Sequence, residues 1–332
     1  MTETFKALVA DQRDDQTISE VRELSRSDLP EAGDVLVRVA YSTLNYKDGL
    51  AVNGKAKVLR SYPMVPGIDL AGTVLESKSA NFKEGDEVVL TGFETGERYW
   101  GGYTQLNRAR SETLVPLPKG LTLKESMIVG TAGLTAMLSV LALADQGLTP
   151  DVAGEVAVTG ASGGVGSMAV VLLAQLGYQV VASTGKAEEH DYLKSLGAKD
   201  VLDRRVLSAE SKRPLEAGRW SAAVDAVGGN TLAGLLRGMA PHSSIALSGN
   251  AGGVALNTTV LPFILRGVSL LGIDSNFAPM DLRVRAWERL AELLPKDALS
   301  LMAKEHTLAD VPELSRMILA AQIRGRIVVD MG

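Results

Sequence analysis

The 332-residue sequence predicts an α/β protein of two domains, a small β-barrel and a parallel, doubly wound sheet. A chain of this length exceeds what one compact core usually contains, so two domains are expected. Before Leu121, short β-rich runs are separated by turn residues, as in a barrel. From Gly154 onward, β-rich runs alternate with helical ones, and this alternation is typical of parallel strands joined by helices.

Five β-rich runs make up the predicted barrel, in the order FKALVAD, DVLVRVAYSTL, GTVLES, DEVVLTG and ETLVPLP. Glycines punctuate these runs, where a twisted barrel needs turns and bends. They are Gly67, Gly72, Gly85, Gly92, Gly101 and Gly102. Near the C-terminus the run RGRIVVDM is again strand-like, and we expect this tail to rejoin the barrel.

Six strands are predicted for the doubly wound sheet, and six is the number in a full dinucleotide-binding sheet. They cover residues 155–159, 179–183, 200–202, 222–225, 244–247 and 268–272. Residues 166–176, rich in alanine and leucine, predict a helix buried against the sheet. Residues 282–294 predict an amphipathic helix after the last strand.

The composition excludes several classes of function. A formal net charge of −5 argues against a nucleic-acid partner, which would favour a basic face. The absence of cysteine excludes disulfides, thiolate nucleophiles and cysteine-containing zinc sites. His190, His242 and His306 lie far apart in sequence, so no metal site is predicted. The charged N-terminus, and the lack of an apolar run that approaches transmembrane length, predict a cytoplasmic protein without a membrane partner.

The segment EVAVTGASGGVG runs from a predicted strand through glycines into a predicted helix. This order predicts a dinucleotide site, in which Gly163 lets the backbone approach a pyrophosphate and Gly166 lets the helix pack closely on the strand. Ser162, Gly164 and Val165 lie where backbone N–H groups and the helix dipole favour phosphate. Ala161 replaces the first glycine of the usual pattern, and a tight strand–helix turn without a ligand is the alternative.

The end of the second predicted strand favours NADPH over NADH. An NAD site usually has an acid there, which binds the ribose 2′-hydroxyl. This sequence has Ser183, Thr184, Gly185 and Lys186 instead, and Arg204 follows the third strand. Hydroxyls and cations suit a 2′-phosphate. The alternative is that Lys186 and Arg204 are solvated surface charges.

Eight motifs spread along the whole chain resemble one family. They are LNYKD, PMVPGIDLAGTV, GDEVVLTG, WGGYTQ, GTAGLTAM, VTGASGGVG, YLKSLGA and PFILRGVSLLGIDS. Together they resemble the medium-chain dehydrogenase/reductase superfamily, and more narrowly its zinc-free quinone-oxidoreductase branch. Within that branch they are most similar to the NADPH-dependent acrylyl-CoA reductases. LNYKD, WGG and GTAGLTAM are together specific to that group, whereas the glycine-rich turn is shared more widely.

The resemblance implies a GroES-like β-barrel catalytic domain from residues 1–125 and 276–332, with a Rossmann NADPH-binding domain at residues 126–275. It also implies a homodimer or higher homo-oligomer, in which the apolar run VSLLGI would suit an edge strand that pairs across a two-fold axis. The zinc-dependent branch has metal ligands near Asn45 and Asp69. Neither cysteine nor histidine stands at those places here, so a zinc-independent enzyme is expected.

The reaction that the resemblance implies is reduction of a carbon–carbon double bond conjugated to a carbonyl group. The expected substrate is a small-molecule acyl-CoA or enone, with acrylyl-CoA converted to propionyl-CoA by NADPH. An NADPH:quinone or enone oxidoreductase is the first alternative. A non-catalytic NADPH-binding protein is the second, because folds outlive their chemistry.

The candidate catalytic residues lie in LNYKD. The resemblance implies that Tyr46 orients the nicotinamide or relays a proton, that Asn45 donates to a carbonyl oxygen, and that Asp48 positions Tyr46 or a water. The alternative is a helix start, with Asn45 as the N-cap residue and Asp48 three positions later. Asp69, in PGIDLAG, is expected to have a structural role in a turn.

Further cofactor contacts are expected around the nicotinamide. The resemblance places Thr131 and Thr135 at a helix start, Leu247, Ile273 and Ser275 at strand ends, and Arg326 against the cofactor or substrate. Simple packing is the alternative for Thr131 and Thr135. A separate cluster of cations, in GKAKVLRSYP, could meet the phosphates of a CoA thioester, or could be a solvated loop.

Overall fold

The structure of the chain is a computed structural model, which describes residues 4–151 and 154–332. The chain forms two compact units. The first comprises Met1–Thr131, Asn276–Ala291 and Leu299–Gly332, and the second comprises Ala132–Ser275 and Glu292–Ala298. The domain boundaries expected from the sequence stay a prediction, because dense contact alone does not show that a unit folds by itself.

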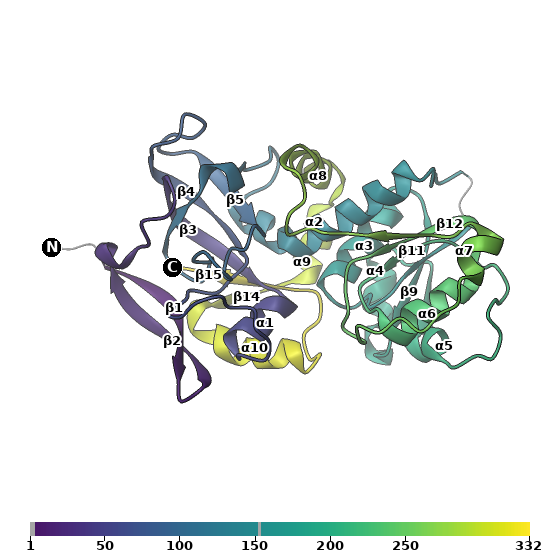
Figure 1. The fold of residues 1–332 in the computed structure, drawn as a ribbon. Coiled ribbons are helices and arrows are strands. Elements are labelled where there is room, and N and C mark those ends of the chain that lie inside the picture. The colour runs from purple at the N-terminus through teal and green to yellow at the C-terminus, as the bar shows by residue number, and fades with distance from the viewer. Residues whose placement is uncertain (1–3, 152–153) are drawn as a thin grey trace. The chain divides into compact units, whose positions relative to one another are not determined.

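The first unit is built on a seven-stranded sheet, with the strand order β14-β15-β3-β4-β5-β7 and with β6 paired to β3 (Figure 1). Its strands are β3 (Val35–Leu44), β4 (Asp69–Ser77), β5 (Glu87–Thr91), β6 (Leu106–Ala109), β7 (Val115–Pro116), β14 (Ala303–Thr307) and β15 (Arg326–Asp330). β15 lies antiparallel to β3, with Ile327 opposite Leu44. The predicted return of the tail to the N-terminal region is therefore confirmed.

A long hairpin and a set of short helices complete this part of the chain. The hairpin pairs β1 (Thr4–Arg13) with β2 (Gln16–Ser25). The helices are α1 (Tyr46–Val52), α8 (Met280–Leu293), α9 (Lys296–Met302) and α10 (Val311–Leu319). β2 and β14 were not predicted from the sequence, because both carry polar and charged side chains and are only partly buried.

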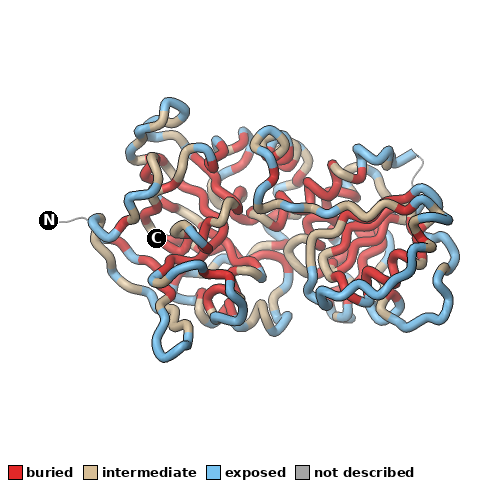
Figure 2. The backbone as a smooth tube through the Cα atoms, in the orientation of Figure 1, coloured by how far each residue is buried: buried red, intermediate tan, exposed pale blue. Residues whose placement is uncertain are grey.

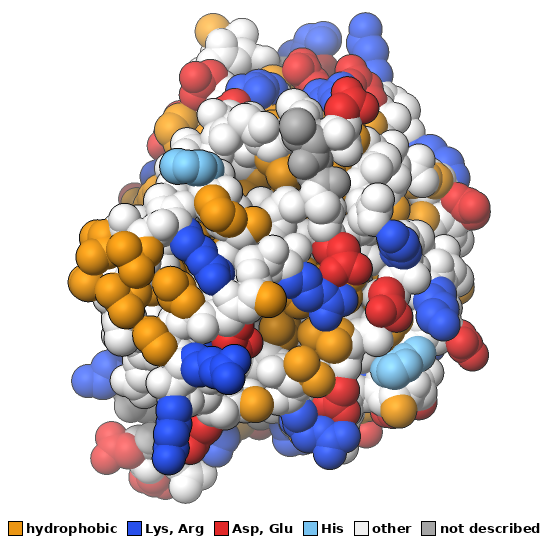
Figure 3. Space-filling model, turned by 90° about the vertical axis from the view of Figure 1, so that its right-hand side faces the viewer, with side chains coloured by type: hydrophobic (Ala, Val, Ile, Leu, Met, Phe, Trp, Pro, Cys, Tyr) orange, Lys and Arg blue, Asp and Glu red, His pale blue; other side chains and the backbone are white. Residues whose placement is uncertain are grey.

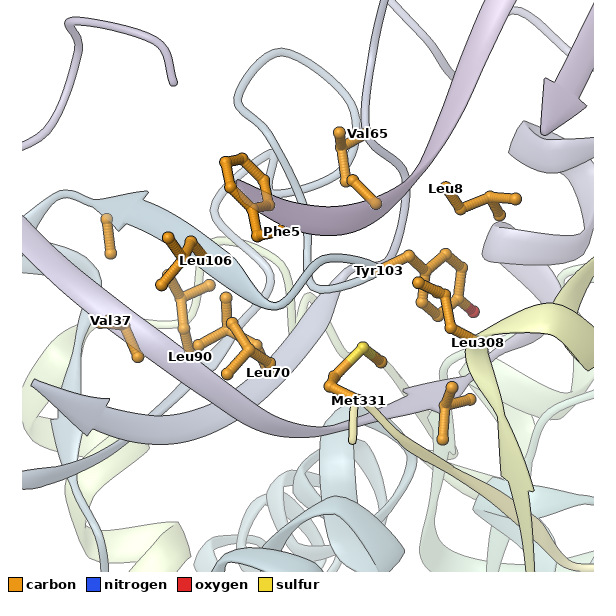
Figure 4. Close-up of a cluster of buried hydrophobic side chains, with 14 of the residues drawn as sticks. Phe5, Leu8, Val37, Val65, Leu70, Leu90, Tyr103, Leu106, Leu308 and Met331 are labelled. Atoms are coloured by element: carbon orange, nitrogen blue, oxygen red, sulfur yellow. The ribbon is translucent and has the colours of Figure 1, made fainter. Parts of the chain in front are cut away.

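The core of the first unit is built from apolar side chains of its strands and of the loops between them. Leu36, Leu70, Leu90 and Val329 are buried and belong to one cluster, which Phe5 and Tyr103 join from β1 and from the loop after β5. Figure 4 shows these strand and loop side chains converging from several segments. Consecutive residues are buried along β4, β5 and β15, so both faces of these strands are covered, since successive side chains point to opposite faces of a sheet.

The second unit holds a six-stranded parallel sheet with the order β10-β9-β8-β11-β12-β13. Its strands are β8 (Glu155–Val158), β9 (Gln179–Thr184), β10 (Asp200–Asp203), β11 (Trp220–Asp225), β12 (Met239–Leu247) and β13 (Ser269–Gly272). All six predicted strands are confirmed. The chain turns back between β8 and β11, and the carboxyl ends of strands at such a switch point are where ligands bind in open α/β sheets.

Helices of the second unit connect these strands, and the central strands β8, β9 and β11 are mostly buried (Figure 2). The helices are α3 (Gly164–Gln175), α4 (His190–Ser195), α5 (Arg204–Ser208), α6 (Gly229–Gly238) and α7 (Leu261–Arg266). α3 is buried over most of its length, from Gly166 to Leu173. The predicted helix at residues 166–176 is thus confirmed, with its start two residues earlier.

Helix α2 (Leu123–Asp145) corrects one expectation from the sequence. By length and composition alone it could cross a membrane, although no apolar run of that length was expected. The most apolar window of the helix is 83% buried inside the protein, as in a core helix. The helix is also interrupted at Gly130, where φ is 49° and ψ is −159°.

Candidate active site

The glycine-rich turn of the second unit connects β8 to α3. Gly160 has φ of 57°, in the left-handed region that glycine adopts without strain. A Cβ atom on Gly166 would lie 2.3 Å from the Gly160 carbonyl oxygen, so only glycine fits where the helix crosses the turn. Gly163 is the N-cap residue of α3, and its own N–H donates to Gly160. Gly164 and Val165 begin the helix, where N–H groups are free to meet an anion.

Side chains with hydroxyl groups lie beside this turn. The Ser162 and Thr184 hydroxyls are 3.2 Å apart, and both residues are buried. Ser183 is only 2% exposed, and its Oγ atom has no hydrogen-bond partner among the described residues. A buried hydroxyl normally has a partner. Its lack of one, at the carboxyl end of β9, is the feature expected where a ligand supplies the bond.

Two cations lie near these hydroxyls. Lys186 is half-buried, and its backbone N–H donates to Thr184 Oγ1 at 3.2 Å. A Cβ atom on Gly185 would lie 2.5 Å from Arg204 Nε, so the arginine side chain lies directly against Gly185. The segment from Ser183 to Lys186 carries hydroxyls and a cation but no acid, and together with Arg204 it fits the adenosine 2′-phosphate of NADPH. The structure therefore brings together the predicted residues of the adenosine end.

Four of the residues predicted for the nicotinamide end, Thr135, Leu247, Ile273 and Ser275, lie in the same unit, whereas Thr131 and Arg326 belong to the first unit. The Thr135 hydroxyl donates to Ser275 Oγ at 2.8 Å, and the Ile273 N–H donates to the Leu247 carbonyl oxygen at 2.9 Å. Asp225, which the sequence analysis missed, is buried at the end of β11 and accepts the hydroxyl of Thr159. An acid three residues before the glycine pair of VDAVGG is the signal that could have found it.

The LNYKD motif forms the start of α1 in the first unit. Asn45 is the N-cap residue, and its backbone N–H donates to Asp48 Oδ2 at 2.8 Å. The predicted capping arrangement is therefore confirmed. Asp48 is fully buried and also accepts the Ile68 N–H at 2.9 Å. Tyr46 is 45% exposed, and within residues 4–151 and 154–332 its hydroxyl has no hydrogen-bond partner.

These contacts bear on two expected roles in this motif. The Asp48 carboxyl group bonds to Asn45 and Ile68, so it can position Tyr46 only by holding the start of the helix, and not by direct contact. Asn45 Nδ2 lies 2.8 Å from Asp69 Oδ2 and 3.1 Å from Asp48 Oδ2. Both hydrogens of that amide are thus directed at carboxyl groups, and neither is left for a substrate carbonyl oxygen.

Asp69 has a larger role than the turn expected from the sequence. It is the first residue of β4 and is fully buried. Its carboxyl group accepts hydrogen bonds from Asn45 Nδ2, from the Thr131 N–H at 2.9 Å and from the Thr131 hydroxyl. The turn prediction was wrong because these partners are distant in sequence, and only the folded chain brings them to one carboxylate.

Arg326, at the start of β15, is 2% exposed and lies in the same buried group. It donates to the Ile128 carbonyl oxygen at 2.9 Å, to Thr43 Oγ1 at 2.8 Å and to Asn45 Oδ1 at 3.2 Å. Its contact with a cofactor or substrate stays a prediction. The three bonds of Arg326 named here join it to residues of the first unit.

Burial governs the charges of this group. It raises the pKa of Asp48 to about 7, with the charge of Asp69 as the next cause. Burial also raises the pKa of Asp69. The hydrogen bonds from Thr131 and Asn45 and the charge of Arg326 lower it, but by less. The pKa of Arg326 is lowered by burial, and the neighbouring carboxylates oppose that change. Burial therefore favours the neutral form of Asp48 more than an exposed carboxyl group would.

Two family models and one full-length relative match this chain. Residues 31–119 match the family model of the alcohol dehydrogenase GroES-like domain, and residues 164–292 match that of the zinc-binding dehydrogenases. Acrylyl-CoA reductase AcuI from Ruegeria pomeroyi is 52% identical, over 98% of this chain and 99% of that protein.

In the part of the chain that the structure describes, no group of three or more histidine, aspartate or glutamate residues could hold a metal ion.

Two solved structures share the fold closely. The yhdH oxidoreductase from Salmonella enterica in complex with NADP is 50% identical with a TM-score of 0.96, over 98% of this chain and 100% of that one. The Bacillus subtilis protein yhfP with NAD bound is 46% identical with a TM-score of 0.96, over 99% and 100% of the two chains.

The raised pKa of Asp48 predicts a particular dependence of stability on pH. Between about pH 4 and pH 7 the folded protein holds a proton on Asp48 that the unfolded chain has lost. The free energy of unfolding should therefore fall as pH rises, by on the order of 1.4 kcal/mol per pH unit from this group. The Asp48→Asn variant lacks the titration. Melting temperatures measured from pH 5 to pH 8 should show the wild type losing stability relative to the variant, and parallel curves would contradict the assignment.

Proposed function

Because the chain belongs to the medium-chain dehydrogenase/reductase superfamily, in its zinc-free quinone-oxidoreductase branch, we propose that it reduces the C=C bond of an α,β-unsaturated thioester with NADPH. Acrylyl-CoA, converted to propionyl-CoA, is the substrate that the similarity favours. The observation that carries this proposal is the 52% identity to acrylyl-CoA reductase AcuI over 98% of the chain. The reaction needs neither a metal nor a covalent nucleophile.

The second unit has the groups that would hold the cofactor. The turn from Gly160 to Gly166 would receive the pyrophosphate at the start of α3, and Ser183, Lys186 and Arg204 would hold the adenosine 2′-phosphate. When bound, NADPH supplies the hydride. The NADP complex of the Salmonella enterica protein supports this choice, although the Bacillus subtilis protein was solved with NAD.

The thioester gains a hydride at its β-carbon and a proton at its α-carbon. Tyr46 is our candidate for the proton, since it is the one residue of LNYKD with an exposed hydroxyl in the described structure. Asn45 and Asp48 are fully engaged in hydrogen bonds with their neighbours. Their contribution is to hold the helix start from which Tyr46 projects, rather than to touch the substrate.

Substrate preference separates the candidate functions. NADPH oxidation should be followed with acrylyl-CoA, crotonyl-CoA and a small quinone side by side. We expect acrylyl-CoA to give the highest kcat/KM. Turnover of the quinone alone would favour the alternative function, a quinone or enone oxidoreductase. Binding of NADPH without turnover of any of the three would favour a non-catalytic protein.

A cluster of cations could hold the phosphates of the CoA moiety. Lys55, Lys57 and Arg60 follow α1 and are exposed, and within the described residues they form no ion pair. Cations that are unpaired and close together in sequence suit a polyanionic substrate tail.

Neutralising this cluster should therefore affect CoA esters selectively. The triple variant Lys55→Gln, Lys57→Gln and Arg60→Gln is expected to raise KM for acrylyl-CoA about tenfold, and to leave KM for a quinone unchanged. A matched control neutralises the exposed Lys119, Lys212 and Lys304. Equal effects of the two triple variants on the acrylyl-CoA KM would argue against a phosphate site.

The second unit has a surface that suits a second copy of the chain. β13 is an edge strand of the six-stranded sheet, and four apolar side chains of α7 and of the segment before it are exposed. Val254 is 86% exposed, Val260 65%, Ile264 68% and Leu265 64%. Figure 3 shows hydrophobic side chains gathered on one side of a molecular face. An unpaired edge beside an apolar patch favours pairing across a two-fold axis, and we propose a homodimer.

The mass in solution tests this assembly. Light scattering after size exclusion should give about twice the 35.1 kDa of one chain. The Ile264→Glu, Leu265→Glu variant should shift the protein towards the monomer, because a dimer would bury both charges. A wild type that is monomeric at micromolar concentration, or a variant that stays dimeric, would contradict an interface at this patch.

A further inference from the structure

The interruption of α2 at Gly130 leaves backbone groups that a continuous helix would pair. In a continuous helix the Thr131 N–H would donate to the Met127 carbonyl, and the Ile128 carbonyl would accept from Ala132. Each half of a broken helix also has a partial charge at the break, negative where the first half ends and positive where the second begins. A buried break therefore needs groups that satisfy both ends.

Two charged side chains lie in this break, each at the end that it complements. Arg326 Nε donates to the Ile128 carbonyl oxygen at 2.9 Å, so a cation meets the negative end of the first half. The Asp69 carboxylate accepts the Thr131 N–H at 2.9 Å and the Thr131 hydroxyl, so an anion meets the positive end of the second half. The two residues are 2% and 0% exposed.

The fit around Gly130 shows that the pair fills the gap. A Cβ atom at this position would lie 2.8 Å from Arg326 Nη2 and 2.8 Å from Asp69 Oδ2. It would also lie 2.9 Å from Thr43 Cγ2. The positive φ of Gly130 and the absence of a side chain both belong to this arrangement.

The same two side chains also hold the start of α1. Asn45 Nδ2 donates to Asp69 Oδ2 at 2.8 Å, and Asn45 Oδ1 accepts from Arg326 Nη1 at 3.2 Å. The amide plane of Asn45 is thus held from both of its ends. Asn45 is the N-cap residue of α1, and Tyr46 is the first residue of that helix.

We propose that Asp69 and Arg326 act as a positioning pair, which keeps α2 broken at Gly130 and, with the same atoms, fixes the helix start that carries Tyr46. The functional half of this inference rests on the proposed reductase activity and on the role of Tyr46 in it. The structural half, the capping of the break, does not depend on any substrate.

Charge and geometry make different demands on the pair. Removing one partner leaves the other charge buried without compensation, which destabilises the fold. Arg326→Lys keeps the charge, but a single ammonium group cannot reproduce the fork that reaches Ile128, Thr43 and Asn45 from three nitrogens. Asp69→Asn keeps the size and removes the charge, and its amide would face the amide of Asn45.

The test compares these two variants with wild type and with Tyr46→Phe, by three measurements. The first is amide hydrogen exchange in the peptide that covers residues 126–133. The second is the dissociation constant of NADPH, and the third is kcat with whichever substrate the wild type turns over. Arg237→Lys is the matched control, since Arg237 forms an ion pair with Glu216 in the second unit.

We expect faster exchange in residues 126–133 for both variants of the pair, kcat lowered by between about 10-fold and 100-fold, and an NADPH dissociation constant within about twofold of wild type. Arg326→Lys should keep a melting temperature near that of wild type while losing kcat. If the pair served stability alone, kcat would fall only in a variant whose melting temperature also falls. Tyr46→Phe should lower kcat without a change in exchange, and Arg237→Lys should change neither.

Unchanged exchange in residues 126–133 for both pair variants would overturn the capping of the break. Wild-type kcat in Arg326→Lys would overturn the positioning of Tyr46. If acrylyl-CoA is not a substrate, only the proposed reaction is contradicted. The role of the pair is still decided, by the exchange measurement and by kcat with any other substrate that the wild type turns over.

Discussion

The buried pair of Asp69 and Arg326 joins segments that are far apart in the sequence. Asp69 begins β4, Arg326 begins β15, and between them they bond to Asn45, Ile128 and Thr131. The return of the C-terminal tail to β3 makes this possible, since it brings the guanidinium to Asn45 and Ile128. Because each charge is buried with the other, neither can be lost alone without a large cost in stability.

The two units supply different parts of the proposed chemistry. The second unit has the features of a dinucleotide site, including a glycine-lined turn, a buried hydroxyl without a partner and two nearby cations. The first unit has a buried group of charged side chains and one exposed tyrosine hydroxyl at a helix start. Hydride transfer by a nicotinamide asks the protein mainly for orientation and for control of a proton. The hydrogen bonds that hold the start of α1 suit the demand for orientation.

Much of the fold could be predicted from the sequence, because the strands of the second unit are short apolar runs separated by helical ones. The six strands and α3 follow from that pattern. β14 could not be found in the same way, since the sequence AKEHT shows little apolar alternation and gains its strand conformation from β15. Helix α2 was missed as an apolar helix of membrane-spanning length, because its glycine and threonine residues divide the run.

The candidate site was predicted in its parts but not in its connections. The capping of α1 by Asn45 and Asp48 is local and could be read from residues three apart. The bonds from Asn45 and Thr131 to Asp69 cross the fold, so Asp69 was mistaken for a turn residue. Its position after a proline and a glycine is typical of a turn, and no local signal shows the partners that fold against it.

Isotope labelling tests the proposed reaction most directly. Acrylyl-CoA should be reduced with NADPH deuterated at the transferred position in ordinary water, and with unlabelled NADPH in deuterated water. We predict propionyl-CoA with one deuterium at C3 in the first case and one at C2 in the second. Deuterium from NADPH at C2, or the absence of propionyl-CoA while a quinone oxidises the cofactor, would contradict reduction of the conjugated double bond.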